Sequence, residues 1–213
     1  PNLDVSITDN LKNNKITVVS KDAANTLWAG SSEAYYYHFG PSGVTTFDTS
    51  DGGKNMIKDI VHTPSETFII GNKSVTINAN GNEKPIPVGH NTLVFDRQGN
   101  YWLGGTIVSR FTENQYRKLT FEQLSYIFQT TLKLQKRTNK LVLGKGDDIW
   151  VGTNFGLYKY SPKDSMQNYT AKLGDINSSV EDLYFDDANN RLLVATNSMG
   201  VIILEDKKIA AHL

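Results

Sequence analysis

The feature that most constrains the fold of this 213-residue chain is a short pattern that it repeats. The pentapeptide IWVGT contains Trp150, and the pattern recurs as YWLGG around Trp102 and as LWAGS around Trp28. The segments FIIGN and LLVAT carry Ile69 and Leu193 in the position of the Trp. These anchors recur about every 40 residues, a period typical of solenoids and β-propellers.

Each copy alternates short apolar segments with turn residues. In the fifth copy the segments VEDLYFD, RLLVAT, VIILE and IAAHL are separated by DANN, NSMG and DKK. Short segments rich in Val, Ile, Leu and aromatic residues, bounded by Gly, Asn and Asp, are typical of strands joined by tight turns. Asp22, Asp96 and Asp187 each lie six residues before an anchor and are expected to lead the turn that precedes it.

This pattern predicts an all-β fold, a β-propeller in which each copy is one four-stranded blade. The Gly of WVGT would let neighbouring blades pack closely, and the Trp would fill the space between their sheets. About five repeats are visible, which gives either a small closed propeller or part of a larger, seven-bladed one. We therefore expect residues 1–213 to form a single propeller domain or a propeller fragment. The repeats lie near 12–50, 51–88, 89–120, 134–175 and 176–213, with a candidate insertion at 121–133.

The composition restricts the classes of partner and chemistry. Lys+Arg and Asp+Glu both number 22, so the chain lacks the basic surplus typical of nucleic-acid binding. No apolar run approaches the roughly 18 residues of a membrane span, so no membrane insertion is expected. The chain has no Cys and its His residues lack metal-ligand spacing, so neither a metal nor another cofactor is expected. The stretch GDDIWVGTNFGLYKY is glycine-rich but matches neither phosphate-loop pattern, G-x-x-x-x-G-K-[ST] or G-x-G-x-x-G.

The copies resemble the two-component regulator propeller repeat, whose consensus runs roughly D-x-x-G-x-x-W-x-G-T-x-x-G-[LV]-x-x-[YF]. The best match runs from Asp148 through Trp150 and Gly152 to Tyr160. The third and first copies match next, at Asp96, Gly99, Trp102 and Gly104 and at Asp22, Trp28 and Gly30.

In that family the repeats form extracytoplasmic sensor regions of bacterial hybrid two-component regulators, often tuned to glycan fragments. Similar propellers occur in surface proteins of the type IX secretion system. The resemblance implies an exported bacterial protein, periplasmic or at the cell surface, that binds or senses without being an enzyme. Its implied partners are an oligosaccharide and neighbouring domains or proteins. Two alternatives stay open: an assembly scaffold without a small ligand, and a streptogramin-lyase-like enzyme, for which His38 and His90 lack an obvious acidic partner.

Two sets of residues are candidates for ligand binding. In the strand AYYYHFG, Tyr36 and His38 share one face, which either packs between blades or is exposed for stacking on a sugar. The turns after the Trp-bearing strands recur on one face of a propeller and are mostly polar and neutral, which suits a carbohydrate better than an anion. Turn chemistry alone also favours Asn and Ser there. No catalytic residue is predicted. The predicted ligand-binding residues are Asn154, Phe155, Asn197, Asn72, Lys73, Ser32, Tyr36 and His38.

Overall fold

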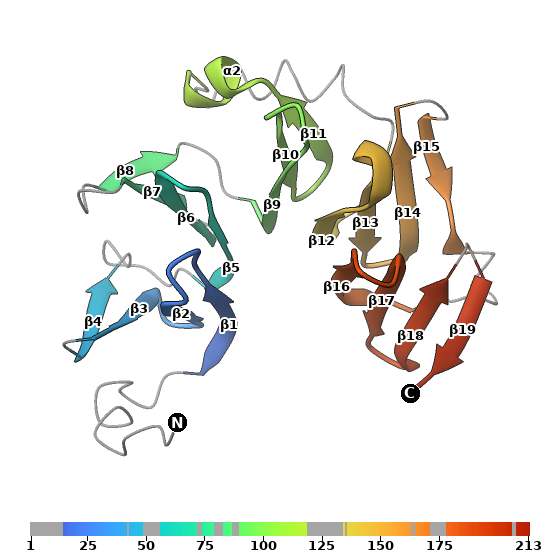
Figure 1. Ribbon diagram of the computed structural model, residues 1–213, viewed down its shortest axis with the longest axis horizontal. Helices are drawn as coiled ribbons and strands as arrows, with labels where there is room; N and C mark the ends of the chain where they lie inside the picture. Colours follow the sequence, from blue (N-terminus) through green and yellow to red (C-terminus); the bar gives the residue numbers. More distant parts are fainter. Residues whose placement is uncertain are drawn as a thin grey trace. The chain divides into compact units, whose positions relative to one another are not determined.

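The structure of the protein is a computed structural model, shown as a ribbon in Figure 1. The chain divides into two compact units, Pro1–His90 and Asn91–Leu213, which we describe in turn. That residues 1–213 form a single domain stays a prediction. The structure describes residues 15–41, 43–48, 56–71, 74–78, 83–86, 90–118, 134, 136–162, 165–170, 178–205 and 208–213.

The first unit contains two four-stranded antiparallel sheets, and the strand order in each follows the chain. Short loops join consecutive strands, as the Gly, Asn and Asp positions predicted. The first sheet comprises β1 (Ile16–Lys21), β2 (Leu27–Ser31), β3 (Tyr35–Gly40) and β4 (Gly43–Asp48). The second comprises β5 (Ile57–His62), β6 (Glu66–Gly71), β7 (Ser74–Asn78) and β8 (Glu83–Ile86).

The second unit contains three sheets of the same kind. The third sheet of the chain has three described strands, β9 (Thr92–Phe95), β10 (Tyr101–Gly104) and β11 (Val108–Phe111), followed by the helix α2 (Glu113–Arg117). The candidate insertion at 121–133 lies outside the described residues. The fourth sheet comprises β12 (Thr138–Leu143), β13 (Ile149–Thr153), β14 (Gly156–Ser161) and β15 (Ser165–Asn168), with the 3-10 turn η1 (Lys145–Asp147) between β12 and β13. The fifth comprises β16 (Val180–Asp186), β17 (Arg191–Thr196), β18 (Gly200–Glu205) and β19 (Lys208–His212).

These sheets are the blades of a β-propeller, so the predicted all-β fold class is confirmed. The first strand of each sheet, which we call the inner strand, lies beside the inner strand of the next sheet in the same unit. In the first unit β1 lies beside β5, and in the second unit β12 lies beside both β9 and β16. The five sheets lie within the residue ranges expected for the five repeats.

The strand register corrects one part of the expected repeat alignment. The inner strands of the first two sheets carry equivalent β-bulges, and the residues paired just beyond them are Gly30 and Ile70. Gly30 and Ile70 are therefore equivalent positions in the two sheets. Trp28 lies two residues before Gly30, and Phe68 lies two residues before Ile70. Phe68 therefore occupies the Trp position of the second copy. The prediction that Ile69 occupies it is wrong by one residue. The error comes from aligning the Gly of FIIGN with that of WVGT, whereas the structure places it at the Thr position.

An aspartate organises the first turn of several sheets, between the inner strand and the second strand. Asp22 accepts hydrogen bonds from two backbone N–H groups of its turn and from Trp28 Nε1, at 3.0 Å. Asp96 accepts the same kinds of bond in the third sheet, including one from its Trp at 3.0 Å. In the fifth sheet Asp186, and not the predicted Asp187, accepts the bonds of the turn.

The tryptophans fill the spaces between neighbouring sheets, as predicted. Trp28 packs against Ile57 and Ile60 of the following sheet within the first unit. In the second unit Trp102 and Trp150 do the same with their own following sheets. Their partners from the following sheets are Leu141, Ile149 and Val151 for Trp102 and Val180, Leu183, Leu192, Val194, Ile202 and Leu204 for Trp150.

The repeated glycine is required by the close approach of neighbouring sheets, which confirms its predicted role. A Cβ added to Gly152 would lie 2.6 Å from Val180 Cγ1, and one added to Gly104 would lie 2.6 Å from Thr138 Cγ2. Val180 and Thr138 are the first residues of the following inner strands. Any larger side chain would therefore push two inner strands apart.

A side chain near the start of each of three inner strands hydrogen-bonds to the next inner strand, a feature that the sequence reasoning missed. Asn139 Nδ2 donates to the carbonyl oxygen of Val180 at 3.0 Å. Asn91 Nδ2 donates to Thr138 O at 2.7 Å, and in the first unit Thr17 Oγ1 donates to Ile57 O at 2.5 Å. The acceptors belong to the same residues that contact the repeated glycines. At each of these three contacts between inner strands, close packing and a hydrogen bond thus involve the same residue of the following strand.

Candidate functional site

The predicted site residues lie at different ends of the sheets. In an antiparallel meander the turn after the first strand and the turn after the second strand lie at opposite ends of the sheet. We call these the first-turn end and the second-turn end. Ser32, Asn154, Phe155 and Asn197 all belong to second turns, as predicted. His38 pairs with Trp28 toward the first-turn end, so it does not lie beside Ser32.

The second-turn end of the fourth and fifth sheets is tied down by backbone hydrogen bonds. The backbone N–H of Asn154 donates to Arg137 O at 3.0 Å, and that of Asn197 donates to Ser179 O at 3.0 Å. Each bond joins a second turn to the segment that leads into an inner strand. Asn154 Oδ1 is buried and accepts no hydrogen bond within the described part of the chain. The turn that carries Asn154 and Phe155 is thus fixed to the rest of its sheet.

Phe155 forms the tip of that turn. Its side chain is 55% exposed, although Phe is usually buried. The ammonium of Lys136 lies 4.8 Å from the ring centroid, a cation–π contact that orders the pair. An exposed ring held in place beside amide groups offers both an apolar face and hydrogen bonds to a ligand.

The other predicted residues belong to the first unit. Tyr36 is fully buried, and its ring stacks on the Phe47 ring at 4.5 Å between centroids. Of the two roles considered for Tyr36, packing in the core is therefore the one observed, and its side chain is not accessible to a ligand. Ser32 lies in the first unit, where its backbone N–H donates to Lys15 O. Asn72 and Lys73 lie outside the described residues.

The first unit groups two histidines around Trp28, a grouping that sequence spacing did not reveal. The His38 ring lies 4.3 Å from the Trp28 ring and the His62 ring 5.7 Å from it, measured between centroids. Burial lowers the pKa of His62, although the charge of Asp22 acts in the opposite sense. Burial raises the pKa of Asp22, but its hydrogen bonds from Trp28 and the turn outweigh this, so the pKa lies below its ordinary value.

These groups do not form an acid–base pair of the kind a propeller lyase needs. His62 Nδ1 hydrogen-bonds to Thr67 Oγ1 at 3.0 Å, whereas the Asp22 carboxylate binds its own turn and Trp28. Among the residues that the structure describes, no group of three or more His, Asp and Glu is placed to hold a metal ion. No helix within the described ranges is long and apolar enough to cross a membrane.

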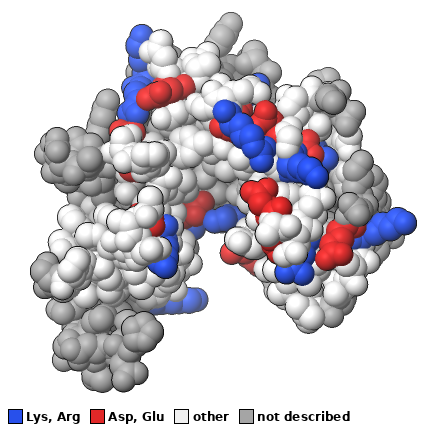
Figure 2. Space-filling view, in the orientation of Figure 1, with Lys and Arg blue, Asp and Glu red and all other residues white. Residues whose placement is uncertain are grey.

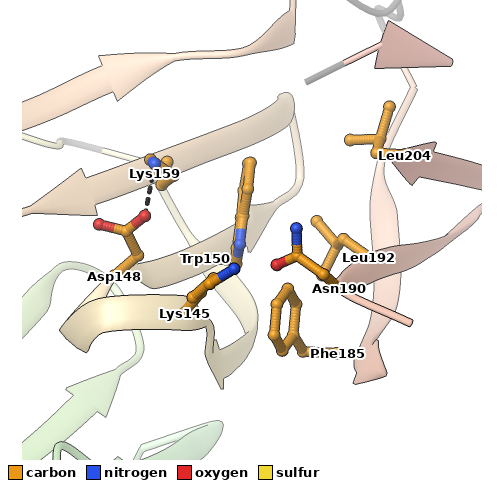
Figure 3. A pocket seen from close by; sticks show the side chains of 8 residues that line it. All are labelled: Lys145, Asp148, Trp150, Lys159, Phe185, Asn190, Leu192 and Leu204. Atoms are coloured by element: carbon orange, nitrogen blue, oxygen red, sulfur yellow. Dashed lines mark hydrogen bonds and ion pairs between the residues drawn. The ribbon is translucent and has the colours of Figure 1, made fainter. Parts of the chain in front are cut away.

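A pocket opens at the first-turn end of the second unit, between the fourth and fifth sheets (Figure 3). Its cavity volume is about 180 Å³. On one side Lys159 Nζ pairs with Asp148 Oδ2 at 2.5 Å and lies 5.4 Å from the centroid of the Trp150 ring. None of its residues was predicted to bind a ligand. The lining residues are Lys145, Asp148, Trp150, Lys159, Phe185, Asn190, Leu192 and Leu204.

Basic and acidic side chains are mixed on the face of the molecule drawn in Figure 2. Within each unit they lie next to one another. Several are paired, such as Arg191 with Asp186 at 2.8 Å and Arg97 with Asp147 at 3.7 Å. Such a surface offers no extended field of one sign to steer a polyanion.

Known proteins resemble the chain in fold. No protein-family model and no curated protein matches it. Among solved structures it is similar to the extracellular domain of the hybrid two-component system protein BT3049 from B. thetaiotaomicron, at 16% identity and a TM-score of 0.67. That match covers 91% of this chain and 28% of the BT3049 chain.

Two further structures represent other functions on the same fold. PorZ, a surface component of the type IX secretion system of Porphyromonas gingivalis, matches 93% of this chain and 33% of its own at 12% identity and a TM-score of 0.60. Virginiamycin B lyase from Staphylococcus aureus matches 99% of this chain and 73% of its own at 11% identity and a TM-score of 0.60. The chain thus spans about a third or less of BT3049 and PorZ, and at these identities the similarity establishes the fold alone.

Proposed function

We propose that this chain is part of an exported, non-enzymatic bacterial binding propeller, and that it recognises a carbohydrate at the second-turn end of its second unit. The observation that carries the proposal is the exposed ring of Phe155, which Lys136 holds on a turn fixed by backbone hydrogen bonds. The parent protein would be a two-component sensor or a similar surface protein, periplasmic or at the cell surface. The fold similarity to BT3049 and PorZ supports that context.

The chemistry of a sugar suits this cluster. One face of a sugar ring carries C–H groups that pack on an aromatic ring, while its hydroxyl groups need donors and acceptors nearby. Phe155 provides the apolar face, and exposed polar side chains of the second turns would provide the hydrogen bonds. Asn197 lies at the same end of the neighbouring sheet and extends the polar surface. Neither a general base nor a nucleophile is needed for binding alone.

Docking of a protein partner is the second candidate function. An exposed aromatic side chain beside a cation is also typical of the anchor of a protein interface. The fold similarity to PorZ, a component of a secretion system, supports this reading. The two candidates differ in the ligand and not in the surface.

The test is a thermal-shift screen of the chain against soluble oligosaccharides, followed by calorimetric titration of any ligand found. A ligand at 100 times its dissociation constant raises the stability by about 2.7 kcal/mol. Replacement of Phe155 by Ala would weaken binding about two- to twelvefold, because an aromatic contact contributes about 0.5–1.5 kcal/mol. Tyr184→Ala is the matched control, since Tyr184 is 64% exposed in the same unit but lies in strand β16.

A glycan that binds wild type and Tyr184→Ala equally and Phe155→Ala more weakly would support carbohydrate recognition. Absence of any shift with a well-folded protein would refute it. Capture of a protein partner by wild type but not by Phe155→Ala would then favour docking.

A further inference from the structure

Beside the pocket at the first-turn end, one copy of the repeat departs from the others. In the first and third sheets an aspartate six residues before the Trp accepts the indole N–H at 3.0 Å. In the fourth sheet the same position is Gly144. The Trp is retained there as Trp150, but the carboxylate that would bind its N–H is missing.

The indole N–H of Trp150 is consequently free. It has no hydrogen-bond acceptor among the residues that the structure describes. The Trp150 ring lies directly against Gly144, since a Cβ added there would lie 2.9 Å from both Nε1 and Cδ1. Trp150 lines the pocket, so the space beside its N–H is open to a ligand.

The charges around the pocket favour a single negative charge. Asp148 and Lys159 neutralise each other through their 2.5 Å ion pair. Lys145 lines the same pocket, is exposed, and has no ion-pair partner within the described part of the chain. Asn190 adds a side-chain amide to the lining, as Figure 3 shows. One unpaired ammonium and one free indole N–H thus face a common space.

The remaining walls are apolar and set the size of the ligand. Phe185, Leu192 and Leu204 come from the fifth sheet and face the Trp150 ring across the pocket. A cavity of about 150 Å³ is known to hold a benzene molecule, so a volume of about 180 Å³ accepts one six-membered ring with a small substituent.

We propose that this pocket binds a small cyclic monocarboxylate, whose carboxylate accepts the indole N–H as the aspartate does in the first and third sheets. One oxygen would accept the N–H of Trp150, and the charge would pair with the ammonium of Lys145. The ring of the ligand would pack against Trp150 and the apolar side chains of the fifth sheet. Both a hexuronate and an aromatic acid have this chemistry. The pocket is separate from Phe155, which lies at the opposite end of the sheets.

Binding is measured by calorimetric titration of the full chain with glucuronate and with benzoate. Glucose and benzyl alcohol serve as the neutral analogues. A carboxylate should bind at least about tenfold more tightly than its neutral analogue, because a hydrogen bond to a charged group contributes about 1.5–3 kcal/mol. Tight binding of glucuronate alone would identify a sugar acid, and tight binding of benzoate alone an aromatic acid.

Three variants test the assignment. Lys145→Gln and Trp150→Phe should each weaken carboxylate binding about tenfold, since each removes one contact to the charge. Gly144→Asp would press its Cβ against the indole, 2.9 Å from Nε1, and bring a second carboxylate to the pocket, so it should abolish binding. Lys118→Gln is the control, because Lys118 is exposed beside α2 and away from the pocket. Circular dichroism establishes that each variant is folded, and the Lys145 variant keeps the test valid if the other two are not.

Equal binding of carboxylates and neutral analogues, no binding to the folded wild type, or unchanged binding by Lys145→Gln would each overturn the proposal. Loss of carboxylate binding in Phe155→Ala would overturn it too, because it would place the ligand at the other end. Phe155→Ala that binds carboxylate normally would support it, whatever the outcome of the glycan screen.

Discussion

Replacement of Gly152 by Ala should destabilise the second unit by forcing two inner strands apart. The added Cβ would lie 2.6 Å from Val180 Cγ1 and 3.3 Å from the Leu183 side chain. Both residues belong to the packed core between the fourth and fifth sheets, so neither can move without disturbing other contacts. Overpacking of this kind costs about 1–3 kcal/mol.

The assay is equilibrium denaturation in urea, followed through tryptophan fluorescence, together with the melting temperature. For a chain of this length each kcal/mol lowers the melting temperature by about 2–4 °C, so a fall of about 2–12 °C is expected. Gly40→Ala is the matched control. A Cβ at Gly40 would lie 3.6 Å from His38 Cε1, which is ordinary van der Waals contact. That variant should be neutral or slightly stabilising.

A second variant separates a steric effect from a loss of backbone freedom. Val180→Ala removes the methyl group that the new Cβ would strike. The double variant Gly152→Ala, Val180→Ala should therefore lose less free energy of unfolding than the two single variants lose together. The coupling should reach at least about 1 kcal/mol, as is usual for residues in direct contact. Additive effects, or a Gly152→Ala variant as stable as wild type, would refute the close approach of the two strands.

Two further predictions concern single hydrogen-bonding side chains. Asn139→Ala should lower the free energy of unfolding by about 1–3 kcal/mol, because Asn139 bonds to both Ser179 Oγ and the carbonyl of Val180. Urea titration would measure this, with Asn197→Ala, at an exposed turn position, as the control. Burial raises the pKa of Asp96, but the hydrogen bonds to its carboxylate outweigh burial and hold the pKa below the ordinary 3.8. The ionised carboxylate therefore contributes stability that is present above pH 3.8 and is lost as the pH falls below it. Asp96→Asn should therefore destabilise the protein at pH 7 and progressively less below pH 3.8, and a difference in urea midpoint that does not change with pH would contradict this.

The fold could be predicted because its signals are local and repeated. The short apolar segments and their turn residues define the strands, and the recurrence of the Trp defines the blade. The sequence alignment failed in the second copy, where Phe68 replaces the Trp and a Gly stands at the Thr position. A bulge in the inner strand sets the true register there, and a bulge leaves no reliable mark in a single sequence.

The candidate site was predictable only in part. Asn154 and Phe155 were identified because turn residues of a repeat recur on one face, and the structure places them together at the second-turn end. Strand alternation could not distinguish Tyr36 from an exposed aromatic, because alternation does not tell which face of the strand the following sheet covers. The pocket at the first-turn end depends on packing between two sheets, which no local pattern specifies. Its one sequence signal was Gly144, standing where the first and third copies have an aspartate.

The length of the first turn shows why that single residue matters. The three sheets with a Trp have five residues between the last paired residues of their first two strands, at 22–26, 96–100 and 144–148. The second and fifth sheets, which lack the Trp, have one residue fewer between the corresponding pairs. Turn length and Trp therefore go together as one structural unit. In the fourth sheet both are kept and only the aspartate is lost. If the aspartate had been lost because the turn had no function, the Trp and the length of the turn would not both have been kept. Places where a chain breaks its own local rule while keeping the surrounding structure are the places where a function is expected.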